Sequence, residues 1–170
     1  PDFDAIPQDV KEAAKIMVVS YPANPICKTA PDEFYEKLIA FAKENNIDLT
    51  VVGPEVPLVN GIVDEFEKKG LKIFGPNKEC STFEGSKSFS KDFMIRHNIT
   101  TAKYKEYTNL DEAISEIDSF GYPVVIKADG LAAGKGVVIP ENREDAINTL
   151  KEMMSDKKFG SAGDKVVIEE

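Results

Sequence analysis

Two lysines and three glycines lie close together between residues 124 and 139, in the sequence VVIKADGLAAGKGVVI. Gly130, Gly134 and Gly136 have no Cβ, so the backbone N–H groups of such a loop can come close to phosphate oxygens. Lys127 and Lys135 add positive charge beside them. The apolar β-branched residues on either side predict two strands. The segment therefore predicts a nucleotide-phosphate loop within a β-hairpin.

This loop differs from the P-loop pattern. The interval from Gly130 to Gly134 is one residue short, and Lys135 is followed by Gly136 where the P-loop has Ser or Thr. The alternative interpretation is a glycine-rich hairpin that carries two solvated lysines.

Composition narrows the class of partner. The chain has 170 residues, with 21 basic and 30 acidic side chains and a net charge of −9. Such a charge argues against nucleic acid or an anionic membrane as partner and favours a small metabolite. No apolar run approaches the length of about 18 residues that spans a bilayer, and the first residues do not resemble a signal peptide. Cys27, Cys80 and His97 predict no metal cluster, and reduced thiols indicate a cytoplasmic protein.

Strand and helix patterns alternate along the chain. Ranges 15–20, 49–52 and 71–74 predict strands, and ranges 32–46 and 62–69 predict helices between them. This order predicts a parallel, Rossmann-like βαβαβ unit over residues 1–76, joined by a connecting helix over 77–98 to an α+β unit over 99–170. In that second unit we expect strands at 103–107, 124–127, 136–139 and 166–169, and helices at 110–120 and 143–155. The fold class is thus α/β.

Five blocks of residues 47–170 resemble glycinamide ribonucleotide synthetase, the phosphoribosylamine-glycine ligase of purine biosynthesis. They are IDLTVVGPEVPLVNGIVDEF, GLKIFGPNK, FEGSKSFSKDFM, YPVVIKADGLAAGKGVV and VVIEE. The resemblance implies a preATP-grasp domain followed by the small subdomain of an ATP-grasp fold. It also implies ATP as cofactor, with Mg²⁺, in a reaction that activates glycine as an acyl phosphate.

The same resemblance assigns roles to individual residues. It implies that two lysines meet the ATP phosphates, that the glycine loop closes over them, and that the last strand leads into the adenine-contacting hinge. Two alternatives stay open: Lys87 and Lys91 lie four residues apart on a helix and could be solvated, and the final glutamates could belong to a fraying terminus. The implied nucleotide residues are Lys87, Lys127, Gly130, Gly134, Lys135, Gly136, Glu169 and Glu170, and the implied substrate residues are Pro54 and Glu55.

Residues 1–46 resemble a different family, the class I pyridoxal-phosphate aminotransferases. The segment SYPANP carries this resemblance, and Asn24 would then approach the cofactor ring. No later segment resembles that family's Schiff-base lysine region. We therefore interpret the chain as a chimera in which one β-α element replaces the beginning of the ligase.

Three functions follow as hypotheses. The first is an ATP-binding fragment of the ligase, inactive by itself because the ATP-grasp subdomain that supplies Mg²⁺ ligands would follow Glu170. The second is a structural chimera without ligand, and the third is a fragment of a transaminase. We also expect self-association through open strand edges, above all through the strand at 166–169.

Overall fold

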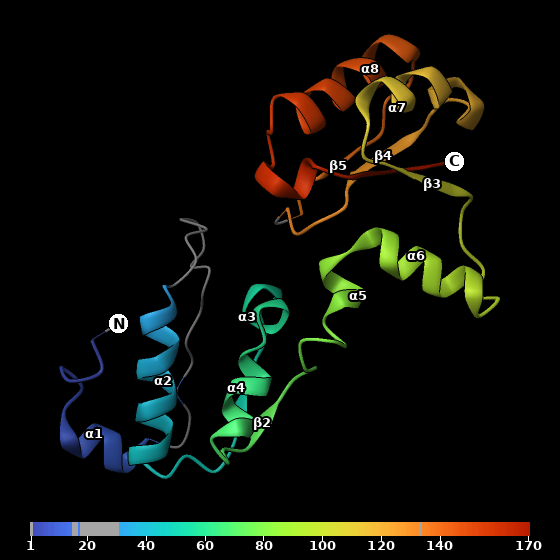
Figure 1. Ribbon diagram of the computed structural model, residues 1–170. Helices are drawn as coiled ribbons and strands as arrows, with labels where there is room; N and C mark the ends of the chain where they lie inside the picture. Colours follow the sequence, from blue (N-terminus) through green and yellow to red (C-terminus); the bar gives the residue numbers. More distant parts are fainter. Residues whose placement is uncertain (1, 15–16, 18–30, 133) are drawn as a thin grey trace. The chain divides into compact units, whose positions relative to one another are not determined.

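The computed structural model describes residues 2–14, 17, 31–132 and 134–170, and it divides into two compact units. The first unit is Pro1–Ser81 and the second is Thr82–Glu170. Figure 1 shows both as mixtures of helices and short strands. The division lies inside the range 77–98 in which a connecting helix was expected.

The first unit contains a two-stranded parallel sheet. Strand β1 (Thr50–Val51) pairs with β2 (Ile73–Phe74) in parallel, as the βαβ pattern predicts. The expected strand at 15–20 lies outside the described residues, apart from Met17. The helices are α1 (Gln8–Ala13), α2 (Asp32–Glu44), α3 (Glu55–Asn60) and α4 (Ile62–Lys68).

Helix α3 was not predicted from the sequence. Gly61 separates α3 from α4 because its φ of +91° is a left-handed conformation that L side chains rarely adopt. Phe66 and Val63 on α4 pack with Ala42 of α2 to form the main apolar core of this unit. The apolar spacing that predicted α2 and α4 therefore marks the faces that meet in this core.

The second unit is built on a four-stranded antiparallel sheet with the order β3-β6-β4-β5. Its strands are β3 (Tyr104–Tyr107), β4 (Val125–Ala128), β5 (Val137–Val138) and β6 (Val166–Glu169). The expected hairpin is confirmed, since Lys127 pairs with Val137 across β4 and β5. The expectation that strand 166–169 is an open edge was wrong, because β6 lies between β3 and β4.

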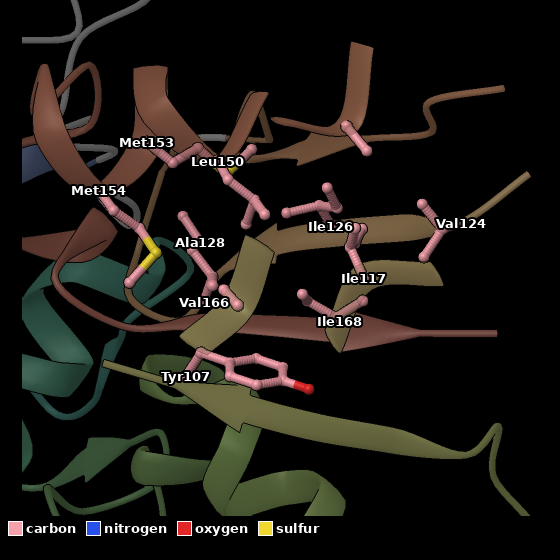
Figure 2. Close-up of a cluster of buried hydrophobic side chains, with 12 residues drawn as sticks. Tyr107, Ile117, Val124, Ile126, Ala128, Leu150, Met153, Met154, Val166 and Ile168 are labelled. Carbon is pink, nitrogen blue, oxygen red and sulfur yellow. The ribbon is translucent and has the colours of Figure 1, made fainter. Parts of the chain in front are cut away.

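Helices cover one face of this sheet. Alternate side chains of β4 and β6, Ile126 and Ile168 among them, point into a core with Leu150 of α8 (Figure 2). These helical segments are α7 (Leu110–Glu116), the 3₁₀ turn η1 (Ile117–Phe120), α8 (Arg143–Leu150) and the π-helical turn η2 (Lys151–Ser155). A further 3₁₀ turn, η3 (Gly160–Gly163), precedes β6.

Helix α6 (Lys87–Arg96) contributes to the other face: its Lys91 side chain reaches Glu169 of β6, and its Ser88 N–H donates to Asp129 directly after β4. The connecting helix expected over 77–98 is divided into α5 (Thr82–Gly85) and α6, because Ser86 is extended and its hydroxyl accepts from the Phe89 N–H. None of the helices in the described part of the chain is long and apolar enough to cross a membrane.

Candidate functional site

Strand register places Lys127 and Glu169 on the same face of the sheet, opposite the helical core. Lys127 lies directly across from Val167, and Glu169 is two residues further along β6. Diagonal neighbours of this kind are within reach of long side chains. The Lys127 ammonium accordingly lies 2.6 Å from Glu169 Oε1. This Oε1 is buried and accepts no directed hydrogen bond, so the contact is an ion pair.

Glu169 has a second cationic partner on α6. Its Oε2 lies 2.8 Å from the Lys91 ammonium, and the Glu169 side chain is only 7% exposed. Burial by itself raises the pKa of this carboxyl group, but the contacts with Lys127 and Lys91 outweigh burial and hold the pKa below its ordinary value. Glu169 is therefore a buried, ionised carboxylate between two ammonium groups.

Asp129 joins the hairpin loop to the beginning of α6. Its carboxylate accepts hydrogen bonds from the Ser88 N–H at 2.6 Å and from the Ser86 hydroxyl at 3.0 Å. The Lys87 N–H donates to the Asp129 carbonyl at 3.2 Å. An acidic side chain that accepts from the first N–H groups of a helix stabilises that helix end. The interaction fixes the start of α6 against the loop.

The Lys87 side chain turns toward the same loop. Its ammonium donates to the Gly130 carbonyl at 3.0 Å and more weakly to the Asp129 carbonyl at 3.4 Å. The pKa of Lys87 lies below its ordinary value, mainly because the side chain is partly buried. The carboxylates of Asp129 and Glu84 raise this pKa, but they do not cancel the effect of burial. The positive charge of Lys127 lowers it further. The Lys87 ammonium thus lies against the loop that follows Lys127.

The glycines of the loop are required for its backbone path. A Cβ at Gly136 would lie 2.6 Å from the Ala132 Cβ and 3.3 Å from the Ala128 Cβ. At Gly130 a Cβ would lie 3.0 Å from the backbone of Ala162. Gly134 has a φ of +74°, which favours glycine. The loop is therefore closely packed at two positions and left-handed at a third.

The other predicted site residues lie apart from this cluster or at its margin. Lys135 is exposed in the turn between the strands. Glu170 is half-exposed and pairs with Lys103 at 2.9 Å. Pro54 and Glu55 belong to the first unit, where Pro54 precedes the first residue of α3. Among the predicted site residues, the structure places Lys87 against Gly130 and Lys127 against Glu169.

Sequence reasoning did not assign Asp129 or Lys91 to the site. Asp129 stands in KADG directly after Lys127, which was a usable signal because Asp is a frequent capping residue. The partner that it caps is 41 positions away in the chain, so sequence gave no direct indication of the contact. Lys91 was considered as a solvated residue, but its side chain is only 11% exposed.

Comparison with known proteins matches residues 4–170 to one family. Residues 4–84 match the N domain of phosphoribosylglycinamide synthetase, and residues 85–170 match the ATP-grasp (A) domain of the same family. A phosphoribosylamine-glycine ligase from Clostridium acetobutylicum is 57% identical over 144 residues, which are 85% of this chain and 35% of that protein. A bifunctional purine biosynthetic protein from Dictyostelium discoideum is 52% identical over 135 residues, 79% of this chain and 17% of that protein.

A solved structure agrees with this result. The phosphoribosylamine-glycine ligase from Thermotoga maritima has a TM-score of 0.52 at 38% identity, over 58% of this chain and 25% of that one. The combination of sheets and helices in this chain accordingly belongs to an α/β, ATP-grasp type of fold.

The N-domain match begins at residue 4 and so includes most of the segment that resembles an aminotransferase. These comparisons do not show an aminotransferase origin for residues 1–46, and they do not support a chimera. Asn24 and the SYPANP segment lie outside the described residues.

The matches cover both units, and the chain spans about a third of the length of the ligase relatives. On the two domain matches and the identity above 50% to ligases, this chain belongs to the phosphoribosylglycinamide synthetase family.

Proposed function

We propose that this chain supplies the nucleotide-phosphate contacts of a phosphoribosylamine-glycine ligase of purine biosynthesis. The observation that carries the proposal is the hydrogen bond from the Lys87 ammonium to the Gly130 carbonyl, in the glycine loop that directly follows the strand of Lys127. Both lysines lie inside the segment that matches the ATP-grasp domain. The two lysines are 40 positions apart in the sequence and belong to different elements. Two lysines from different elements beside one closely packed glycine loop support a phosphate site more than a solvated hairpin.

The chemistry of the donors fits the phosphates of ATP. An ammonium on a flexible stem suits a phosphate as a point charge, and Lys127 is the more exposed partner of its ion pair, at 25% against 7% for Glu169. Lys87 donates to carbonyl oxygens, which carry no full charge, so phosphate oxygens can replace them. Bound ATP would supply the phosphoryl group that activates a carboxylate. The role of this chain's residues is to hold and orient the phosphates and to offset their charge.

The two carboxylates beside the loop already have partners in this chain. Both Asp129 oxygens accept from Ser86 and Ser88, and both Glu169 oxygens face lysines. No group of three potential metal ligands occurs among the residues that the structure describes. We therefore assign no metal ligand here and propose the phosphate contacts alone.

We also propose roles for the other residues that the sequence indicated. We propose Glu169 and Glu170 for the adenine side, because Glu169 is the last residue of β6 and Glu170 directly follows it. Lys135, Gly134 and Gly136 are proposed for closure of the loop, and Pro54 and Glu55 for the substrate side. The preATP-grasp assignment of the first unit is proposed on its parallel strand pair and its N-domain match.

Calorimetric titration with ATP and with inorganic tripolyphosphate tests this proposal. Lys127→Met and Lys87→Met should each weaken binding of both by about 10–100-fold, the effect of losing one charge-assisted hydrogen bond. Lys105→Met is the matched control: it removes the same charge from β3, where Lys105 pairs with Glu116 at 2.6 Å. Equal weakening by all three variants would reduce the effect to net charge and contradict the proposal.

A further inference from the structure

Lys91 is a buried lysine that the proposed phosphate contacts do not use. It lies one helical turn after Lys87 on α6, yet its side chain is only 11% exposed. Its ammonium lies 2.8 Å from Glu169 Oε2 and donates to the Thr101 hydroxyl at 2.7 Å. It also lies 5.8 Å from the centre of the Tyr104 ring. Each of these partners restricts the position of the Lys91 ammonium.

Glu169 shares its charge between two lysines of unequal exposure. Lys91 holds one oxygen from the buried side, and Lys127, at 25% exposed, holds the other. Removing one partner of a buried ion pair is costly, because the remaining charge is left uncompensated. A phosphate that draws Lys127 away from Glu169 would incur this cost if no second cation were present.

We infer that Lys91 is a positioning residue that retains Glu169 and thereby allows Lys127 to leave the carboxylate for a bound phosphate. This inference rests on the proposed function. With Lys91 present, Glu169 keeps an ammonium partner after Lys127 has moved. Without Lys91, Glu169 and the phosphate compete for the same lysine.

Lys91 could act on the phosphate directly or through Glu169, and the double variant Lys91→Met/Glu169→Gln distinguishes these two roles. If Lys91 contacts the phosphate directly, the loss of binding in Lys91→Met persists when Glu169 is also neutralised. If Lys91 acts through Glu169, then Glu169→Gln removes the competing charge and restores binding. Tripolyphosphate is the probe because it has no adenine and so does not report a role of Glu169 in base recognition.

The experiment compares wild type and three variants of this 170-residue chain by titration with tripolyphosphate. Lys91→Met should weaken binding by about tenfold or more, Lys91→Arg should stay within about threefold of wild type, and Lys91→Met/Glu169→Gln should recover most of the loss. A double variant as weak as Lys91→Met would overturn the inference. Hydrogen exchange of the sheet amides verifies that each variant is folded.

A second measurement needs no ligand, so it separates this inference from the proposed function. The rate at which acetic anhydride modifies Lys127 reports how tightly Glu169 holds that ammonium, with Lys105 as internal reference. Lys91→Met should slow the modification of Lys127 and Glu169→Gln should accelerate it. An unchanged or faster rate in Lys91→Met would contradict the inference, whereas a wild-type chain that binds no polyphosphate would contradict the proposed function alone.

Discussion

Glu169 is almost inaccessible to solvent and still ionised, because Lys127 and Lys91 face its two oxygens. Its pKa is lower in the folded chain than the ordinary value of 4.5. The unfolded chain therefore binds this proton more readily than the folded chain does. The stabilisation from Glu169 is complete above its ordinary pKa and is lost as the pH falls through the lowered pKa of the folded state.

The free energy of unfolding should consequently fall more steeply in wild type than in Glu169→Gln as the pH decreases from about 6 to about 3. Urea denaturation at several pH values measures the difference. Glu116 and Asp118 also have lowered pKa values, but they titrate in both proteins and cancel in the comparison. Parallel pH profiles would show that Glu169 is not ionised through these contacts.

The sequence could nominate Lys87 and Lys127 but not the arrangement around them. Lys127 and Glu169 share a face only because Val167 is the residue opposite Lys127, and this register is set by the whole sheet. Lys91 was indistinguishable from a solvated lysine, since helical spacing says nothing about what covers that side of a helix. Burial and register had to come from the structure.

The hairpin loop and α6 are connected mainly through Asp129. Asp129→Ala should destabilise the second unit by about 1–2 kcal/mol, because the Ser88 N–H loses its acceptor at the helix start. The amide of Ser88 should exchange faster with solvent, measured by NMR. Asp156→Ala is the control, because Asp156 is exposed at the end of η2. Unchanged exchange at Ser88 would show that the loop and the helix are held together by other contacts.

The loop between β4 and β5 should be sensitive to a single methyl group. Gly136→Ala places a Cβ 2.6 Å from the Ala132 Cβ, so the turn must shift, at a cost of about 1–3 kcal/mol. Thermal denaturation and the cross-strand contacts of Ile126 with Val138 report the change. Gly53→Ala is the matched control, since nothing lies within 4 Å of its added Cβ. Equal effects at both positions would contradict this account of the loop.

Element types were largely predictable, and element ends were not. Apolar spacing and β-branched runs located the hairpin and the amphipathic helices, because burial selects those patterns. Two interruptions escaped prediction. Ser86 caps α6 with its hydroxyl and so separates it from α5, and Gly61 adopts a left-handed conformation between α3 and α4. Each is one residue whose backbone differs from the helix around it.

The second unit leaves two strands of its sheet at the edge, β3 and β5. If two copies of the chain associate through a strand edge, they therefore have to pair through β3 or β5 and not through 166–169. Strand β5 is the better candidate, because Val137, Val138 and the following Ile139 are exposed. We expect light scattering to show association that rises with concentration and is reduced by Ile139→Lys. A strictly monomeric chain at high concentration would contradict this expectation.

The chain has two structural units and matches two domains of the family. The proposed phosphate site lies in the second unit. The most direct measurement follows the amide signals of Gly130, Gly134 and Gly136 during titration with ATP. The proposed site predicts saturating shifts at these glycines and at the start of α6 in wild type, strongly reduced in Lys127→Met and unchanged in Lys105→Met. Absence of shifts in wild type, or equal shifts in wild type and Lys127→Met, would contradict it.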